Sequence, residues 1–99
     1  MQAKSKNPLE REIEKTLVKK VKAAGGLCLK WTSSVTGVPD RLVFLNRQVH
    51  LVELKTATGK VSPRQIVMFQ LLSTLGFPVW ILRSTTEIER FLEQAPRLK

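Results

Sequence analysis

The sequence predicts a single α/β domain in which a mixed central sheet is flanked by helices. The expected element order is α-β-β-β-α-β, followed by a short C-terminal helix. A length of 99 residues suits one compact core. Apolar residues recur at helical spacing in three segments, and four short apolar runs between them have the length of strands. We assign residues 1–8 to a basic N-terminal tail and residues 9–95 to the domain.

The first elements are expected to be a helix and a strand. From Leu9 to Ala24 apolar residues recur at steps of three and four, which is typical of an amphipathic helix. Two glycines at 25–26 end that helix. The apolar run at 27–31 predicts a strand, and the small polar residues at 32–39 predict a loop.

The middle of the chain predicts a β-hairpin. Two apolar runs, 41–45 and 49–54, are separated by Asn46 and Arg47, which would be the central pair of a two-residue turn. An Asn-Gly pair would have been a stronger turn signal. If both residues form the loop, the register of the two strands follows from the turn length, and only a bulge would shift it.

The remaining elements follow a loop rich in small residues. Ser62, Pro63 and Gln65 have the pattern of an N-cap, a first helical proline and a capping-box glutamine, which predicts a helix that extends to Leu75. The last two elements are a strand at 79–82 and a short helix that opens at 84–87.

Charge and ligand chemistry narrow the possible functions. Seventeen Lys and Arg against eight Asp and Glu give a net charge of +9, which favours nucleic acid as the partner. Cys28 and His50 are too few for a structural zinc, so any metal is expected to be bound by oxygen. No signal peptide and no apolar run near the ~20 residues of a membrane span are present, so we expect no membrane partner and a cytoplasmic location.

Two carboxylates stand alone in the basic middle of the chain. Residues 15–86 contain eleven Lys or Arg and only Asp40 and Glu53 as acids. In the predicted register these two are directly opposed, with Cβ atoms about 4.5 to 5.5 Å apart. Alternation places Lys55 on the same face as Glu53. Paired carboxylates suit Mg²⁺ or Mn²⁺, and Lys55 could orient an attacking water or offset phosphate charge.

Other candidates have competing explanations. On the first helix Glu14 lies at the edge of the apolar stripe and could add a carboxylate, with Glu10 as its rival. Asp40 could cap a turn instead of binding a metal. Gln65 suits a capping box as well as a site. His50 faces away from the carboxylates in this register and is expected to pack in the core.

At this point the motifs resemble those of a known family. Residues 37–40 (Gly-Val-Pro-Asp), followed after twelve residues by 53–55 (Glu-Leu-Lys), resemble the split motif of restriction-endonuclease-like nucleases. The flanking Arg-Leu-Val, the strand that ends Val-Glu-Leu-Lys and the later Gln65 resemble the virus-type replication-repair nuclease (VRR-NUC) domain. The resemblance extends from about Glu10 to Phe91.

The resemblance implies a restriction-endonuclease-like core, Mg²⁺ or Mn²⁺ dependence and hydrolysis of DNA phosphodiesters. By residue it implies metal binding by Asp40 and Glu53, catalysis by Lys55, an outer-sphere role for Glu14 in preference to Glu10, and support from Gln65. Short family members resemble Holliday junction resolvases, which predicts a homodimer that cuts branched DNA in DNA repair. The protein would act in the cytoplasm, or in that of the host if it is viral.

Two alternatives remain open from the sequence. One is a non-catalytic nucleic-acid-binding module of the same fold. The other is a nuclease of linear DNA, flap DNA or RNA, because recognition of the 2′-hydroxyl leaves no mark in a sequence of this kind.

Overall fold

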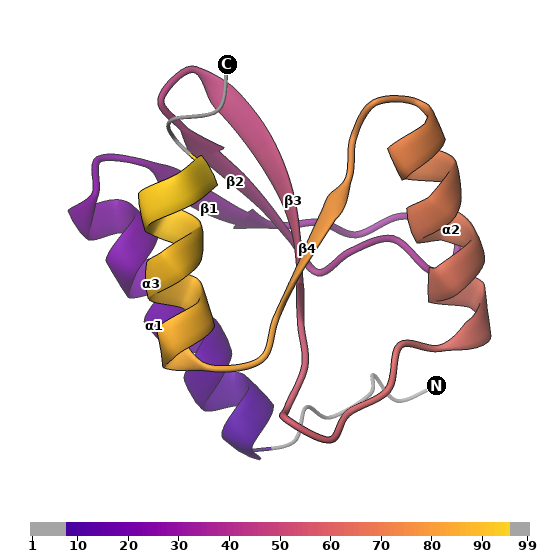
Figure 1. The fold of residues 1–99 in the computed structure, drawn as a ribbon, viewed down its shortest axis with the longest axis horizontal. Helices are drawn as coiled ribbons and strands as arrows, with labels where there is room; N and C mark the ends of the chain where they lie inside the picture. The colour runs from indigo at the N-terminus through magenta and orange to yellow at the C-terminus, as the bar shows by residue number, and fades with distance from the viewer. Residues whose placement is uncertain (1–7, 96–99) are drawn as a thin grey trace.

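A computed structural model of the chain describes residues 8–95, which form a four-stranded sheet with helices on both sides (Figure 1). The elements are α1 (Pro8–Ala23), β1 (Leu27–Lys30), β2 (Arg41–Leu45), β3 (Gln48–Leu54), α2 (Pro63–Thr74), β4 (Val79–Leu82) and α3 (Thr85–Gln94). Their order is the predicted one, and each boundary lies within one residue of its expected position. Pro8, assigned to the N-terminal tail, instead begins α1, while the rest of that tail lies outside the described residues.

The sheet is mixed, as predicted. Its strand order is β1-β2-β3-β4, in which β1, β2 and β3 pair antiparallel and β4 pairs parallel to β3. The parallel pair requires a crossover between β3 and β4, and α2 provides it. This topology places the loops at the ends of β3 and β4 at the same edge of the sheet.

The β2–β3 hairpin has the register that the turn length predicted. Leu45 pairs with Gln48, and the ladder continues outward to the pair of Arg41 and Val52. Asn46 and Arg47 have φ values of 55° and 66°, the left-handed conformations that a type I′ turn requires at both central positions. Asparagine adopts this conformation readily, whereas arginine does so only because the hairpin imposes it. No bulge interrupts the ladder, so side chains stay on their predicted faces.

The hydrophobic core lies between the sheet and the helices α1 and α3, which share one side of it (Figure 1). Its buried members are Leu17, Val21, Val43, Leu45, Val52, Leu54, Leu82, Ile88, Phe91 and Ala95. His50 is also buried on this side, with its ring 5.6 Å from that of Phe91 in an edge-to-face contact. The predicted role of His50 as a packed strand residue is confirmed.

The opposite side of the sheet is covered much less. α2 lies on this side but buries none of its residues, and Ile66, Val67 and Leu71 remain about half exposed or more. Phe44 and Ile81, which alternate with core residues along their strands, are each more than a third exposed. We call the exposed apolar residues of α2 and of this sheet surface the open face. In the part of the chain from Pro8 to Ala95, none of the helices is both long and apolar enough to cross a membrane.

Candidate active site

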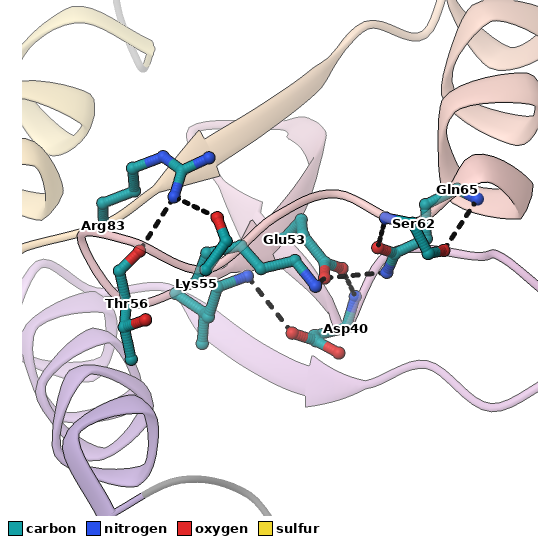
Figure 2. Close-up of polar contacts among 9 residues, drawn as sticks. Asp40, Glu53, Lys55, Thr56, Ser62, Gln65 and Arg83 are labelled. Atoms are coloured by element: carbon teal, nitrogen blue, oxygen red, sulfur yellow. Dashed lines mark hydrogen bonds and ion pairs between the residues drawn. The ribbon is translucent and has the colours of Figure 1, made fainter.

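Four of the predicted site residues meet beside the open face, at the end of the hairpin away from its turn (Figure 2). Asp40 immediately precedes β2, and Glu53 is the penultimate residue of β3. Lys55 follows β3, and Gln65 lies in the first turn of α2. The hairpin register, the parallel crossover and the helix cap together bring these side chains to one place.

The side chains of Asp40 and Glu53 each accept a hydrogen bond from a main-chain amide on the opposite strand segment. The amide of Asp40 donates to Oε1 of Glu53 at 3.2 Å, and the amide of Leu54 donates to Oδ2 of Asp40 at 3.1 Å. Main-chain pairing between β2 and β3 stops one residue earlier, so these side-chain bonds replace the next step of the ladder. The opposed carboxylates that the register predicted are therefore neighbours, and each is fixed by a main-chain donor.

Glu53 is a buried carboxyl group with two polar side-chain partners. It is 1% exposed, and its Oε2 lies 3.1 Å from Nζ of Lys55 and 2.8 Å from Nε2 of Gln65. Burial raises the pKa of Glu53, and the negative charge of Asp40 raises it further, against the opposing effects of Lys55 and Gln65. Because the folded pKa exceeds the ordinary value of 4.5, ionisation of Glu53 weakens the metal-free fold as pH rises through that folded pKa.

Gln65 completes the capping box of α2 and also contacts Glu53. Its side-chain Oε1 accepts from the main-chain amide of Ser62 at 3.1 Å, and its main-chain amide donates to Oγ of Ser62 at 3.2 Å, which completes the capping box. The other end of the same side chain, Nε2, donates to Glu53. The start of α2 and the buried carboxylate are thus held by one amide group.

This double role predicts the effect of Gln65→Glu. The new carboxylate keeps an acceptor for Ser62 but replaces the donor to Glu53 with a second negative charge. We expect a loss of about 1 to 3 kcal/mol in the free energy of unfolding at neutral pH, shrinking in acid as one carboxyl group protonates. Urea unfolding at both pH values measures it, with Gln70→Glu at an exposed position of α2 as the control. Equal stability of the two variants at neutral pH would contradict a stabilising hydrogen bond from Gln65 to Glu53.

Glu14 is held by a neighbour of the site and does not join the carboxylate pair. Its Oε2 accepts from Nε and Nη2 of Arg41 at 3.0 and 2.8 Å, and both side chains are largely shielded from solvent. Arg41 pairs with the core residue Val52, so its side chain lies on the side of the sheet opposite to Glu53. A signal for this ion pair existed in the sequence, because a glutamate at the edge of an apolar stripe needs a cation partner.

The acidic donor set of the site consists of two carboxylates. Between Pro8 and Ala95 no three His, Cys, Asp or Glu residues come close enough to hold a metal ion together. Outer-sphere roles for Glu14 or Glu10 therefore remain predictions. The buried carboxylate of Glu53 and the partly buried, repelling carboxylate of Asp40 could hold a hard divalent cation such as Mg²⁺, which retains water ligands and accepts phosphate oxygens.

A cleft of about 620 Å³ opens beside the carboxylates, between the loop before β2 and the start of α2. Lys55, Lys60 and Arg64 bring three cationic side chains to its wall. Gly37 makes the close approach of the two segments possible: its φ is 99°, and a Cβ there would lie 2.8 Å from the carbonyl oxygen of Arg64. A cationic cleft next to a carboxylate pair is suited to a phosphodiester, whose charge the lysines and the arginine would offset.

The fold and this site define a nuclease of the restriction-endonuclease-like class, in which a mixed sheet carries an acidic pair and a lysine at the end of a hairpin. The chain belongs to the VRR-NUC family, because the model of the VRR-NUC domain matches residues 3–86. This match confirms the resemblance seen in the motifs. The family is one of nucleases, so nucleic acid is the class of substrate.

Two relatives illustrate the match. The chain is 42% identical over 77 residues to "Putative nuclease p44" of Acyrthosiphon pisum secondary endosymbiont phage 1, covering 76% of this chain and 83% of that protein. A solved structure described as a VRR-NUC domain superposes with a TM-score of 0.82 at 26% identity, covering 89% of this chain and 98% of the other. The predicted fold class is therefore confirmed.

Proposed function

We propose that the protein is a Mg²⁺- or Mn²⁺-dependent endonuclease that hydrolyses DNA phosphodiester bonds. The observation that carries this proposal is the pairing of the buried Glu53 with the partly buried Asp40 beside a cationic cleft. A buried carboxylate with a second carboxylate beside it costs stability unless a cation offsets the charges, so its presence in a small domain favours a functional reason. When bound, a divalent cation would polarise the phosphate and make a water nucleophilic near neutral pH.

Each side chain of the site has a different proposed role. Asp40 and Glu53 would hold the cation, and Gln65 keeps Glu53 oriented through its amide donor. Nζ of Lys55 lies beside Oε2 of Glu53, from where it would orient the attacking water and offset charge that develops on the phosphate. Lys60 and Arg64 at the cleft wall would bind flanking phosphates, with a salt-dependent contribution to affinity.

We further propose that the protein acts as a homodimer on branched DNA such as Holliday junctions, in the service of DNA repair. One site on a domain of this size reaches one scissile phosphate, whereas paired cuts across a junction require a two-fold arrangement. The open face supports this proposal, because exposed large apolar side chains on α2 and on the sheet are the kind of surface that a protein partner covers. The phage source of one relative is in keeping with a viral protein that acts in the cytoplasm of its host.

The dimer is expected to depend on α2. Val67 is 67% exposed in the open face, so Val67→Glu should convert a dimer at micromolar concentration into a monomer. Analytical ultracentrifugation measures this change, and Lys19→Glu on the exposed face of α1 is the control for added negative charge. A parent protein that sediments as a monomer while cutting junctions symmetrically would contradict the proposal.

The substrate is tested with labelled nucleic acids of matched sequence. Four-way junctions, flaps, linear duplexes, single strands and RNA are each incubated with Mg²⁺, with Mn²⁺ and with EDTA. We expect paired cuts in junctions at the highest rate and no cleavage in EDTA. Preference for flaps, linear DNA or RNA would retain the nuclease and change its substrate, whereas tight binding without cleavage would identify a non-catalytic module.

A further inference from the structure

Arg83 lies beside the site at a position with no assigned role. It directly follows β4, where Leu82 is paired with Leu54 of β3. Its Nη1 donates to the carbonyl oxygens of Thr56 at 2.8 Å and Gly59 at 2.6 Å. Figure 2 shows the guanidinium of Arg83 beside Thr56. One guanidinium nitrogen therefore holds both ends of the turn that follows Lys55.

That turn lies close to the side chain of Lys55. A Cβ placed on Gly59 would lie 3.6 Å from Cδ of Lys55, so the main chain at Gly59 runs near the aliphatic part of the lysine. The amide of Gly59 closes the turn by donating to Thr56 at 3.2 Å. The main chain of Lys55 is fixed as well, since its amide donates to the carbonyl oxygen of Leu82 at 3.2 Å.

The base of Arg83 is itself anchored. Its amide donates to Oε1 of Glu87 at 2.7 Å, and the amide of Glu87 donates to Oγ of Ser84, the N-cap of α3. The arginine therefore connects the start of α3 to the turn after β3. A rigid connection of this kind can limit the positions open to the side chain that packs against the turn.

We infer that Arg83 is a positioning residue for Lys55, acting through the turn at 56–59. The inference rests on the proposed function, in which Nζ of Lys55 acts on the reacting groups from its place beside Glu53. Arg83 does not touch those groups. It keeps the turn closed, and the closed turn holds the lysine stem so that Nζ stays near Oε2 of Glu53.

The first test needs no activity. Trace acetylation with acetic anhydride, read by mass spectrometry, gives the reactivity of Lys55 relative to Lys19, an exposed lysine of α1. In Arg83→Met we expect Lys55 to react faster because the turn no longer restrains it, with a rise in amide hydrogen exchange at Gly59. Arg90→Met, which removes an exposed arginine of α3, should leave both measurements unchanged.

The second test separates chemistry from binding. At saturating DNA, Arg83→Met is expected to lower the single-turnover rate by about 10- to 100-fold, the scale of effect of small misplacements, while the Kd for DNA stays within about twofold. Arg83→Lys retains a cation and a donor for the turn and should recover part of the rate. The rate of Arg90→Met should equal that of the parent.

Two outcomes would overturn the inference. A weaker Kd with a smaller salt dependence and an unchanged rate at saturation would make Arg83 a phosphate contact. Unchanged Lys55 acetylation in a folded Arg83→Met protein would show that the turn does not restrain the lysine. If the parent cleaves no nucleic acid, the proposed function fails, yet the acetylation and exchange measurements still decide whether Arg83 positions Lys55.

Discussion

Asp40→Asn is expected to lower metal-dependent cleavage by about a thousandfold or more, because the loss of a metal ligand removes several kcal/mol of transition-state stabilisation. The substitution preserves shape. An asparagine Oδ1 can still accept the hydrogen bond from Leu54, and the amide of residue 40 can still donate to Glu53. Single-turnover cleavage at saturating DNA measures the loss, and DNA affinity is expected to remain near that of the parent because the cationic cleft is unchanged.

The same substitution should stabilise the protein in the absence of metal. Removing the charge of Asp40 removes a cause of the raised pKa of Glu53, so the buried carboxylate ionises at lower cost. The expected gain is about 0.2 to 1 kcal/mol, the range for opposed like charges on neighbouring strands. Thermal melts in EDTA should place the Tm of the variant above that of the parent, and millimolar Mn²⁺ should raise the parent more than the variant.

Glu12→Gln is the matched control for these melts, since it also removes one negative charge, from an exposed position of α1. It should alter neither cleavage nor the response to Mn²⁺. An Asp40→Asn protein that is less stable than the parent in EDTA and responds equally to Mn²⁺ would instead make Asp40 a structural turn residue.

Lys55→Met is expected to reduce cleavage by about 10²- to 10³-fold, the scale found when a donor aimed at developing charge is removed. Methionine retains most of the aliphatic stem that packs by Gly59, so the turn should persist. Binding of Mn²⁺, followed by calorimetry, should survive because Asp40 and Glu53 remain. Lys19→Met, at an exposed position of α1, should cleave like the parent. A Lys55→Met enzyme with the parent rate would exclude Lys55 from the chemistry.

The acidic pair was predictable because it depends on local structure. A two-residue turn sets the register of the strands that it joins, so the opposition of Asp40 and Glu53 follows from counting outward from Asn46 and Arg47. The N-cap of α2 was equally local, since Ser62 and its partner lie within one turn of helix. Elements of this kind carry their signals in adjacent residues.

Contacts between distant segments were harder to foresee. The bond from Gln65 to Glu53 requires α2 to be placed against the end of β3, and the bonds of Arg83 require β4 to lie parallel beside β3. Periodicity identifies these elements but does not give their mutual placement. The ion pair of Glu14 with Arg41 was missed for the same reason, because it depends on how α1 is rotated over the sheet.

The apolar pattern of α2 predicted the helix but not how far its side chains are buried. Its hydrophobic residues favoured a helix packed on the sheet, but none of them is buried in the single chain. Periodicity shows that a surface is apolar and not what covers it. The proposed dimer accounts for this surface.

The most direct measurement of the central claim is cleavage of one labelled four-way junction by the parent protein in millimolar Mg²⁺ or Mn²⁺ and in excess EDTA, with Asp40→Asn in parallel. The account predicts cleavage by the parent in either metal, none in EDTA, recovery when metal is restored, and cleavage by Asp40→Asn that is about a thousandfold slower or more in either metal. Full activity of the parent in excess EDTA, or cleavage by Asp40→Asn at the parent rate, would contradict a metal-dependent nuclease built on Asp40 and Glu53.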